Sequence, residues 1–377
     1  MTQQGLRQAS ARNLSGFATG SNYNEDFLHL FDAQGVPAGT FNQRQLRWIN
    51  ARMGASFTNL DEAMQAYATG QGVYNWSSLG TLEDTANFTR VMPYGAIYTR
   101  AGGATALNAD GTVAELAADV PQRTSRGLAL EPATTNFALR YHAMEVAPWT
   151  TLNATVTANA IAGPDGTTTA DKIAETATTG AHGIYQSCVT VAGQAYTQSC
   201  YAKAAERGFL VMTEGSNVTS TAVFNLSTGE VASVTGTGSP SAAIVAVANG
   251  WYWCSLTFTP ISVLSNIQIR ASNAASSAAY AGTAGSGIYA WGGQFELGAY
   301  ASSGIHTSTT VAVRGLPVFT EIVPVGRTKA LLTYADATTT LVTGLTPGGT
   351  FDVATAVIGA SKGRFASSEL VSRVWQA

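Results

Sequence analysis

The sequence predicts a mostly β protein in which antiparallel strands form a two-layer β-sandwich. Short runs rich in β-branched and aromatic residues, separated by turn-forming residues, recur about every 8 to 14 residues between residue 81 and Phe295. Apolar residues make up 45% of the 377 residues and charged residues 11%, a composition that can form a packed core. Few helical segments interrupt these runs, which argues against a parallel sheet flanked by helices.

The first 80 residues carry two segments with helical spacing. Residues 42–53 and 60–69 place apolar side chains three and four positions apart, and Gly70 follows the second segment as a stop signal. Two short helices bury little apolar surface by themselves. We therefore expect a short helical N-terminal region at residues 1–80, which either docks onto another protein or caps the sandwich.

Tight turns indicate where strands pair within residues 81–315. The strongest signal is Asn-Ala-Asp-Gly at 108–111, and we expect its strands at Ile97–Thr99 and Val113–Leu116. Residues 226–230 predict a second turn, and residues 192–194 predict a hairpin turn between Cys188 and Cys200. These two cysteines could pair, but an odd set of three cysteines favours buried free thiols.

Residues 316–377 form a third segment with a strand pattern of its own. Strand candidates lie at 330–334, 338–342 and 350–353, and Thr-Pro-Gly-Gly at 346–349 is a turn. We expect a small β C-terminal tail that docks a partner. The predicted domains are therefore residues 1–80, 81–315 and 316–377.

Six short phrases between Phe88 and Arg314 carry a resemblance to a known family. In chain order they are GLALEPATTN (127–136), GPDGTTTADK (163–172), YAKA (201–204), FNLSTG (224–229), NGWYWC (249–254) and IYAWGGQFELG (288–298). Together they resemble the concanavalin-A-like carbohydrate-binding modules of phage tail fibres and virion head spikes, including the spike base of gene-transfer agents. Trp253 departs from the pattern, because it stands where the NGWYR phrase of the family has arginine.

The resemblance implies a jelly-roll, concanavalin-A-like sandwich in a virion protein that binds host cell-surface polysaccharide. The N-terminal region would anchor the protein to capsid or tail proteins, and the C-terminal tail would dock a distal fibre protein. Such particle parts are usually symmetric homo-oligomers, with threefold or fivefold symmetry here. Two alternatives stay open: a purely structural adaptor that holds a separate receptor-binding fibre, and a capsule depolymerase.

The alternation of side chains along a β-strand identifies Trp251 and Trp253 as candidate sugar-contacting residues. Along residues 251–259, Tyr252 and every second residue after it face the core, so the two tryptophans face the opposite side. Indole rings stack well on the apolar faces of sugars and are costly to leave exposed. Contact with another subunit and packing within the chain are the alternatives.

The same parity proposes Gln294 and Glu296 as hydrogen-bonding partners of sugar hydroxyls. Along residues 288–296, Tyr289, Trp291, Gly293 and Phe295 alternate onto one face, which we expect to be the core, so Gln294 and Glu296 point outward. The Gly292-Gly293 pair permits a bulge in this strand.

Other classes of function find little support in the sequence. A net charge of −3 without a basic stripe argues against nucleic-acid binding. No apolar run is long enough to insert into a membrane, and the start of the chain lacks a signal-peptide pattern. We therefore expect a protein made without a signal peptide in the bacterial cytoplasm and assembled into the virion.

Chemistry at a metal or catalytic centre is likewise not predicted. The four histidines are scattered without paired spacing, and the oxygen-rich residues 165–171 lack the spacing of an EF-hand. Glycosidase chemistry needs two carboxyl groups held close together, and nothing in the sequence brings two together. The sequence therefore predicts no cofactor, no metal ligands and no enzymatic activity.

Overall fold

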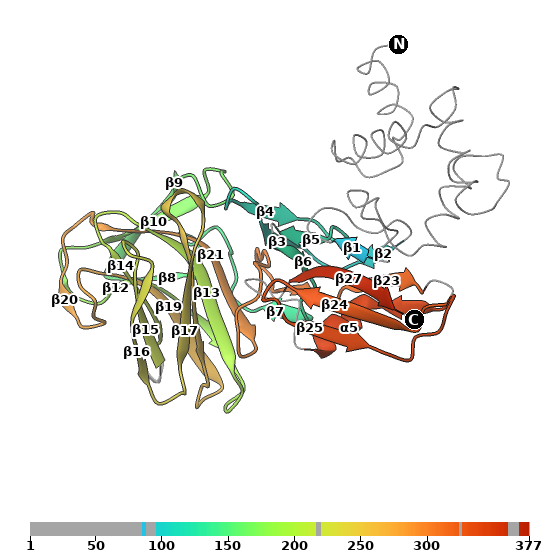
Figure 1. The fold of residues 1–377 in the computed structure, drawn as a ribbon. Helices are drawn as coiled ribbons and strands as arrows, with labels where there is room; N and C mark the ends of the chain where they lie inside the picture. Colours follow the sequence, from blue (N-terminus) through green and yellow to red (C-terminus); the bar gives the residue numbers. More distant parts are fainter. Residues whose placement is uncertain are drawn as a thin grey trace, which may run out of the picture. The chain divides into compact units, whose positions relative to one another are not determined.

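The computed structural model describes residues 85–87, 96–124, 126–215, 220–323, 326–360 and 369–376. The described chain is mostly β and is built from antiparallel sheets (Figure 1). It forms two compact units. The two-sheet unit comprises Thr99–Ser125 and Glu131–Pro317, and the terminal unit comprises the described parts of Met1–Tyr98, Arg126–Leu130 and Val318–Ala377. The helices predicted at 42–53 and 60–69 lie outside the described residues.

One six-stranded sheet of the two-sheet unit has the strand order β17-β18-β13-β21-β10-β9, and we call it the β13 sheet. Its neighbouring strands all run antiparallel. The strands are β9 (Ala154–Ile161), β10 (Ala170–Glu175), β13 (Tyr196–Ala204), β17 (Ser241–Ala246), β18 (Tyr252–Phe258) and β21 (Gly287–Leu297).

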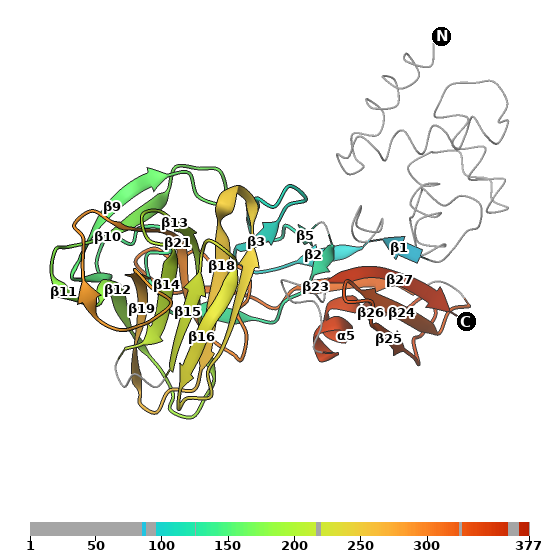
Figure 2. The ribbon, with the colours of Figure 1, turned by 60° about the vertical axis from the view of Figure 1, so that its left-hand side comes forward.

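The second six-stranded sheet, the β14 sheet, has the order β16-β15-β14-β19-β12-β8. It is also antiparallel throughout, and Figure 2 shows its strands beside those of the β13 sheet. The strands are β8 (Thr150–Leu152), β12 (His182–Val189), β14 (Phe209–Glu214), β15 (Ser220–Asn225), β16 (Glu230–Gly236) and β19 (Leu264–Ser272).

The two sheets share one hydrophobic core. Alternate side chains of each strand enter it, as the period of two along a strand requires. The expectation that β18 turns Cys254, Leu256 and Phe258 toward the core is confirmed, because all three are fully buried there. The other main members are Ile184, Tyr196, Cys200, Leu210, Met212, Phe224, Ile267, Ile269, Ile288 and Phe295.

Two of the expected turns connect different strands from those predicted. The turn at 108–111 joins β3 (Ala104–Leu107) to β4 (Val113–Leu116). The strand Ile97–Thr99, labelled β2, instead neighbours β23 (Val318–Ile322) in another sheet. The turn at 192–194 is tight, with Gly193 at φ +81°, but it leads from the β14 sheet to the β13 sheet and so is no hairpin.

The turn at residues 226–229 joins β15 to β16 as expected. Gly229 adopts φ +75° and its backbone nitrogen donates to the Asn225 carbonyl oxygen at 2.9 Å. Cys188, Cys200 and Cys254 are free and buried, so the considered pairing of Cys188 with Cys200 is not found.

Shorter elements complete the two-sheet unit. They are β5 (Gln122–Thr124), the pair β7 (Thr134–Asn136) and β22 (Ala312–Arg314), the pair β11 (Thr179–Gly180) and β20 (Tyr280–Ala281), and a 3-10 turn, η1 (Ala248–Gly250).

The terminal unit has its own sheets and its own core. One sheet contains the order β25-β24-β27-β6, with β1 paired to β27, and a smaller sheet has the order β2-β23-β26. Leu128, Leu332, Val357 and Trp375 are among its buried core residues. The strands are β1 (Thr85–Asn87), β2 (Ile97–Thr99), β6 (Gly127–Ala129), β23 (Val318–Ile322), β24 (Lys329–Tyr334), β25 (Thr339–Val342), β26 (Thr350–Asp352) and β27 (Leu370–Gln376).

Two features of the terminal unit were not predicted. Strand β6 comes from the middle of the chain, so residues 316–377 share a core with Leu128 and Leu130. Helix α5 (Val353–Gly359) follows β26, and its N-cap Asp352 accepts from the Thr355 backbone nitrogen at 3.1 Å. Among the described residues no helix has the length and apolarity to cross a membrane.

Candidate functional site

The four residues proposed for sugar contact are all buried. Trp251 and Trp253 are 1% and 6% exposed, and Gln294 and Glu296 are each 2% exposed. The predicted alternation of side chains along β18 is correct, because Trp253 faces away from the core that contains Cys254. The expectation that this face is open to solvent is wrong for these four side chains.

The reason is a third layer of chain that covers the outer face of the β13 sheet. The indole nitrogen of Trp251 donates to the Ala162 carbonyl oxygen at 3.3 Å. The β3–β4 hairpin joins this layer, because the Gly304 backbone nitrogen donates to Thr105 Oγ1 at 2.8 Å. Side chains on this face therefore pack within the chain, one of the alternatives left open for the tryptophans.

A bulge in β21 overturns the predicted continuous aromatic face. The register between β13 and β21 shifts at Gly292-Gly293, where Gly292 adopts φ +71°. The shift changes the phase of alternation, so Phe295 lies in the shared core while Trp291 packs on Tyr141 and Tyr201. Gln294 and Glu296 point away from the core as expected, but under the covering layer.

Glu131, in the phrase GLALEPATTN (127–136), belongs to a buried polar network. The Glu131 carboxylate pairs with the Arg314 guanidinium at 3.0 Å. It also accepts from the Ser303 backbone nitrogen at 2.9 Å, from the Ser303 hydroxyl, and from Gln122 Nε2 at 2.9 Å. Burial raises the pKa of Glu131, but the charge of Arg314 and these hydrogen bonds outweigh burial and hold the pKa below its ordinary value.

The last phrase, IYAWGGQFELG (288–298), forms hydrogen bonds with the neighbouring loop at 299–307. Glu296 accepts from the Ser302 backbone nitrogen at 2.8 Å and from the Ser302 hydroxyl at 2.6 Å. Gln294 Nε2 donates to Glu296 at 2.8 Å, and Gln294 Oε1 accepts from the Ile305 backbone nitrogen at 2.8 Å. Burial raises the pKa of Glu296, and the nearby Arg314 charge offsets only part of this effect. These hydrogen bonds hold the loop at 299–307 against the sheet.

Arg100 has a comparable structural role. Its guanidinium is buried and donates to three backbone carbonyl oxygens, those of Gly102 at 3.2 Å, Val120 at 2.9 Å and Ala117 at 2.8 Å. The polar residues of the phrases thus satisfy buried backbone groups where the chain is irregular. Through these contacts the phrases contribute to the framework of the two-sheet unit.

A shallow cleft lies beside this framework. Its walls include Thr134, Glu296, Tyr300 and Arg314. The Thr134 hydroxyl has no hydrogen-bond partner within the described part of the chain. A carboxylate, a guanidinium, a hydroxyl and an aromatic ring therefore meet at one small opening.

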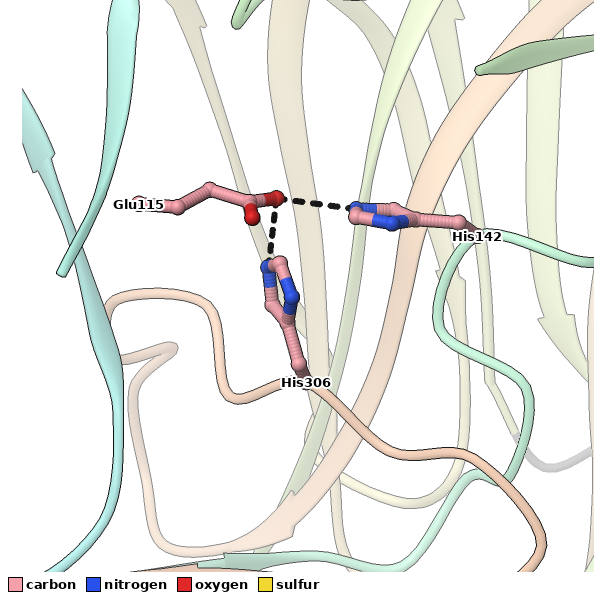
Figure 3. A group of neighbouring side chains, drawn as sticks. All are labelled: Glu115, His142 and His306. Carbon is pink, nitrogen blue, oxygen red and sulfur yellow. Dashed lines mark ion pairs between the residues drawn. The ribbon is translucent and has the colours of Figure 1, made fainter. Parts of the chain in front are cut away.

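A second group of polar side chains, Glu115, His142 and His306, converges at the surface (Figure 3). Glu115 Oε1 lies 2.8 Å from Nε2 of His306 and 3.3 Å from Nε2 of His142. The three ligand atoms all lie within 4.8 Å of one another. We refer to this group as the His-Glu cluster.

Backbone pairing brings the two histidines together. The Tyr141 backbone nitrogen donates to the Thr307 carbonyl oxygen at 3.1 Å, and that of Arg140 donates to Ser308 at 3.0 Å. These bonds place the segments that carry His142 and His306 side by side. Glu115 reaches them from β4, whose Val113 nitrogen donates to the Pro164 carbonyl oxygen at 2.9 Å.

Aromatic packing fixes the orientation of both imidazole rings. Tyr141 stacks on His306 with ring centroids 4.4 Å apart, and Trp291 lies 4.5 Å from His142. The Trp291 indole nitrogen is itself held by Thr169 Oγ1 at 2.9 Å. Each imidazole is therefore supported on a ring face while its Nε2 atom stays directed at Glu115 (Figure 3).

The electrostatics of the His-Glu cluster favour an ionised carboxylate beside neutral His142. Burial, together with the charge of the neighbouring His306, lowers the pKa of His142 to about 4, although Glu115 opposes the shift. Burial raises the pKa of Glu115, but the hydrogen bond from His306 and the charges of both histidines leave it below the ordinary value.

Sequence reasoning missed the His-Glu cluster, and the prediction of no metal ligands did not consider it. Its members come from three separate segments with no motif spacing, so only the fold unites them. A third described histidine, His182, lies apart from the cluster, where its ring nitrogens contact the Asn153 and Tyr280 carbonyl oxygens at 2.8 and 3.2 Å.

Comparison with known proteins adds no relative: no protein-family model and no curated protein matches this chain.

Proposed function

We propose that this protein is a fibre or head-spike component of a virus-like particle, and that its two-sheet unit binds host cell-surface polysaccharide. The observation that carries the proposal is the placement of the six phrases. Five lie wholly within the two-sheet unit, and the first crosses into it at Glu131. Two six-stranded antiparallel sheets on one core support the finer assignment to a concanavalin-A-like, jelly-roll sandwich.

The shallow cleft is the part of this unit best suited to contact a sugar. Carboxylates accept hydrogen bonds from sugar hydroxyls, guanidinium groups donate them, and an aromatic ring can pack against an apolar sugar face. The half-buried Tyr300 offers the aromatic ring, whereas the side chains of Glu296 and Arg314 are at most 2% exposed and lie in the wall behind it. The cleft is small, so we propose that it holds one edge of a sugar ring. Repeated copies on a particle would then raise the overall affinity.

Binding of the full-length protein to host cells and to a polysaccharide array tests this function. We expect Tyr300→Ala to weaken binding about tenfold, which corresponds to roughly 1.4 kcal/mol. Tyr185→Ala, in the β14 sheet and outside the cleft, is the matched control and should bind as the unchanged protein does. Equal binding by both variants would remove the cleft from the proposal, and absence of binding to any polysaccharide would reject the function.

A structural adaptor is the second candidate, and the burial of the four predicted sugar contacts favours it. In that role the N-terminal region anchors the protein to capsid or tail proteins, and the terminal unit docks a distal fibre protein. Images of purified particles labelled on this chain would distinguish the roles, since an adaptor lies between particle and fibre. We propose no catalytic activity; release of reducing ends from capsule polysaccharide would instead identify a depolymerase.

A further inference from the structure

We infer that Glu115, His142 and His306 bind one divalent transition-metal ion of the zinc class. The inference rests on the geometry of the His-Glu cluster and does not depend on the proposed function. Two imidazole nitrogens and one carboxylate oxygen form a recognised donor set for such ions, with a solvent molecule completing the coordination.

The separations between donor atoms suit a shared ion. Zinc bonds to histidine nitrogen and carboxylate oxygen are about 2.0 to 2.2 Å long, so neighbouring ligand atoms lie roughly 3 to 3.5 Å apart. The Glu115 oxygen lies 2.8 and 3.3 Å from the two Nε2 atoms. Small side-chain rotations would therefore exchange the direct contacts for bonds to an ion.

The cluster is organised in advance and open on one side. Backbone pairing of residues 140–141 with 307–308 fixes the spacing of the histidines, and Tyr141 and Trp291 support their rings. The side chains of Glu115, His142 and His306 remain 39%, 27% and 37% exposed, so an ion can enter from solvent and keep a bound water.

The donor types select the class of ion. Calcium and magnesium prefer six or more oxygen ligands, whereas two of the three donors here are nitrogen. Zinc accepts this mixture at low coordination number. A bound ion would join three segments distant in sequence, namely β4, the loop after β7 and the loop after β21, and would thereby stabilise the covering layer of the two-sheet unit.

Calorimetric titration of the full-length, chelator-treated protein with Zn²⁺ tests the inference, together with thermal unfolding with and without Zn²⁺. We expect one ion per chain and a rise in unfolding temperature, because an ion that binds only the folded state stabilises it. Ca²⁺ and Mg²⁺ should leave the unfolding temperature unchanged. His306→Gln should weaken Zn²⁺ binding by more than about tenfold, since even outer-shell changes cost that much.

Glu115→Gln is the second variant, chosen because an exposed glutamine can still contact His306 and should preserve the fold. It should also weaken Zn²⁺ binding by more than about tenfold. Glu206→Gln and Glu230→Gln are matched controls at described carboxylates outside the cluster, and both should bind Zn²⁺ normally. The inference is overturned if the unchanged protein shows no Zn²⁺ binding, or if His306→Gln and Glu115→Gln bind as the controls do.

Discussion

Glu131 and Arg314 form an ion pair in which neither side chain is more than 1% exposed, with the guanidinium Nη1 atom 3.0 Å from the carboxylate. The pair links the first recognised phrase to the strand that ends the two-sheet unit. The carboxylate also accepts hydrogen bonds from Ser303 and Gln122, so several donors within the chain satisfy it. Loss of either member of such a pair leaves a buried charge alone.

Glu131→Ala should therefore lower the free energy of unfolding by about 3 to 5 kcal/mol. Denaturant unfolding followed by tryptophan fluorescence measures the change. The exposed pair Lys172–Glu206 is the control, because Glu206 is half exposed and Glu206→Gln should cost less than about 1 kcal/mol. Equal costs for the two variants would contradict the structural role given to Glu131.

Asn136 makes four hydrogen bonds, and a carboxylate cannot reproduce the two that the side-chain amide donates. Its Nδ2 donates to the Gly293 and Ile305 carbonyl oxygens at 3.3 and 2.9 Å. Its Oδ1 accepts from the backbone nitrogens of Ala138 and Phe295, each at 3.0 Å. An aspartate here would set a buried charge against two carbonyl oxygens.

We expect Asn136→Asp to destabilise the protein by at least about 2 kcal/mol at neutral pH, with partial recovery as acid neutralises the new carboxylate. Unfolding at neutral and mildly acidic pH measures both effects. In the control, Asn225→Asp, the side chain only accepts from Ser227 and Thr228 nitrogens in an exposed turn, so little should change. A neutral outcome at Asn136 would contradict the hydrogen-bond assignment.

Tyr141 requires a glycine at position 304. A Cβ atom built on Gly304 would lie 2.1 Å from the Tyr141 hydroxyl oxygen, far inside contact distance. That hydroxyl has no hydrogen-bond partner in the described part of the chain, so its removal costs little.

Gly304→Ala should destabilise the protein by about 1 to 3 kcal/mol, the usual range for overpacking. Tyr141→Phe should be close to neutral alone and should recover part of the loss in the double variant. Thermal unfolding of the four proteins gives the coupling energy directly. Purely additive effects would show that the two residues do not collide.

The alternation of side chains along β18 predicted which residues enter the core, but it did not predict which residues are exposed to solvent. The period of two placed Cys254, Leu256 and Phe258 in the core, because alternation is a local property of an extended chain. Whether the opposite face meets water depends on distant segments, and here the β3–β4 hairpin and the loop at 299–307 cover it. The exposure of Trp251 and Trp253 could therefore not be read from β18 alone.

Strand β21 shows a second limit of prediction from sequence, which is that a bulge changes the side to which the following residues point. The sequence permits a bulge at Gly292-Gly293, but parity cannot tell whether one forms, and one bulge moves every later side chain to the other face. The His-Glu cluster shows a third limit. His142 and His306 meet because backbone segments pair across the fold, and such long-range pairing leaves no spacing signal in one sequence.

Asp171 should make stability depend on pH in the opposite sense to most carboxylates. Burial and the charge of Glu145 raise its pKa to about 6, although the backbone nitrogens of Asn159 and Met144 donate to it at 2.9 Å each and oppose the shift. A carboxyl whose folded pKa is raised stabilises the fold below its unfolded pKa of about 4, and this contribution is lost as the pH rises through 6.

Asp171→Asn should therefore flatten the dependence of unfolding free energy on pH between about 4 and 6, since an amide does not titrate. Asp110→Asn is a control of opposite sign. The hydroxyl and backbone nitrogen of Thr112 lower the pKa of Asp110, so its contribution is present above the ordinary pKa and is lost only as the pH falls through its lowered value. Denaturant titrations of the three proteins at stepped pH make the comparison. If Asp171→Asn left the slope between pH 4 and 6 intact, another group would have to carry that dependence.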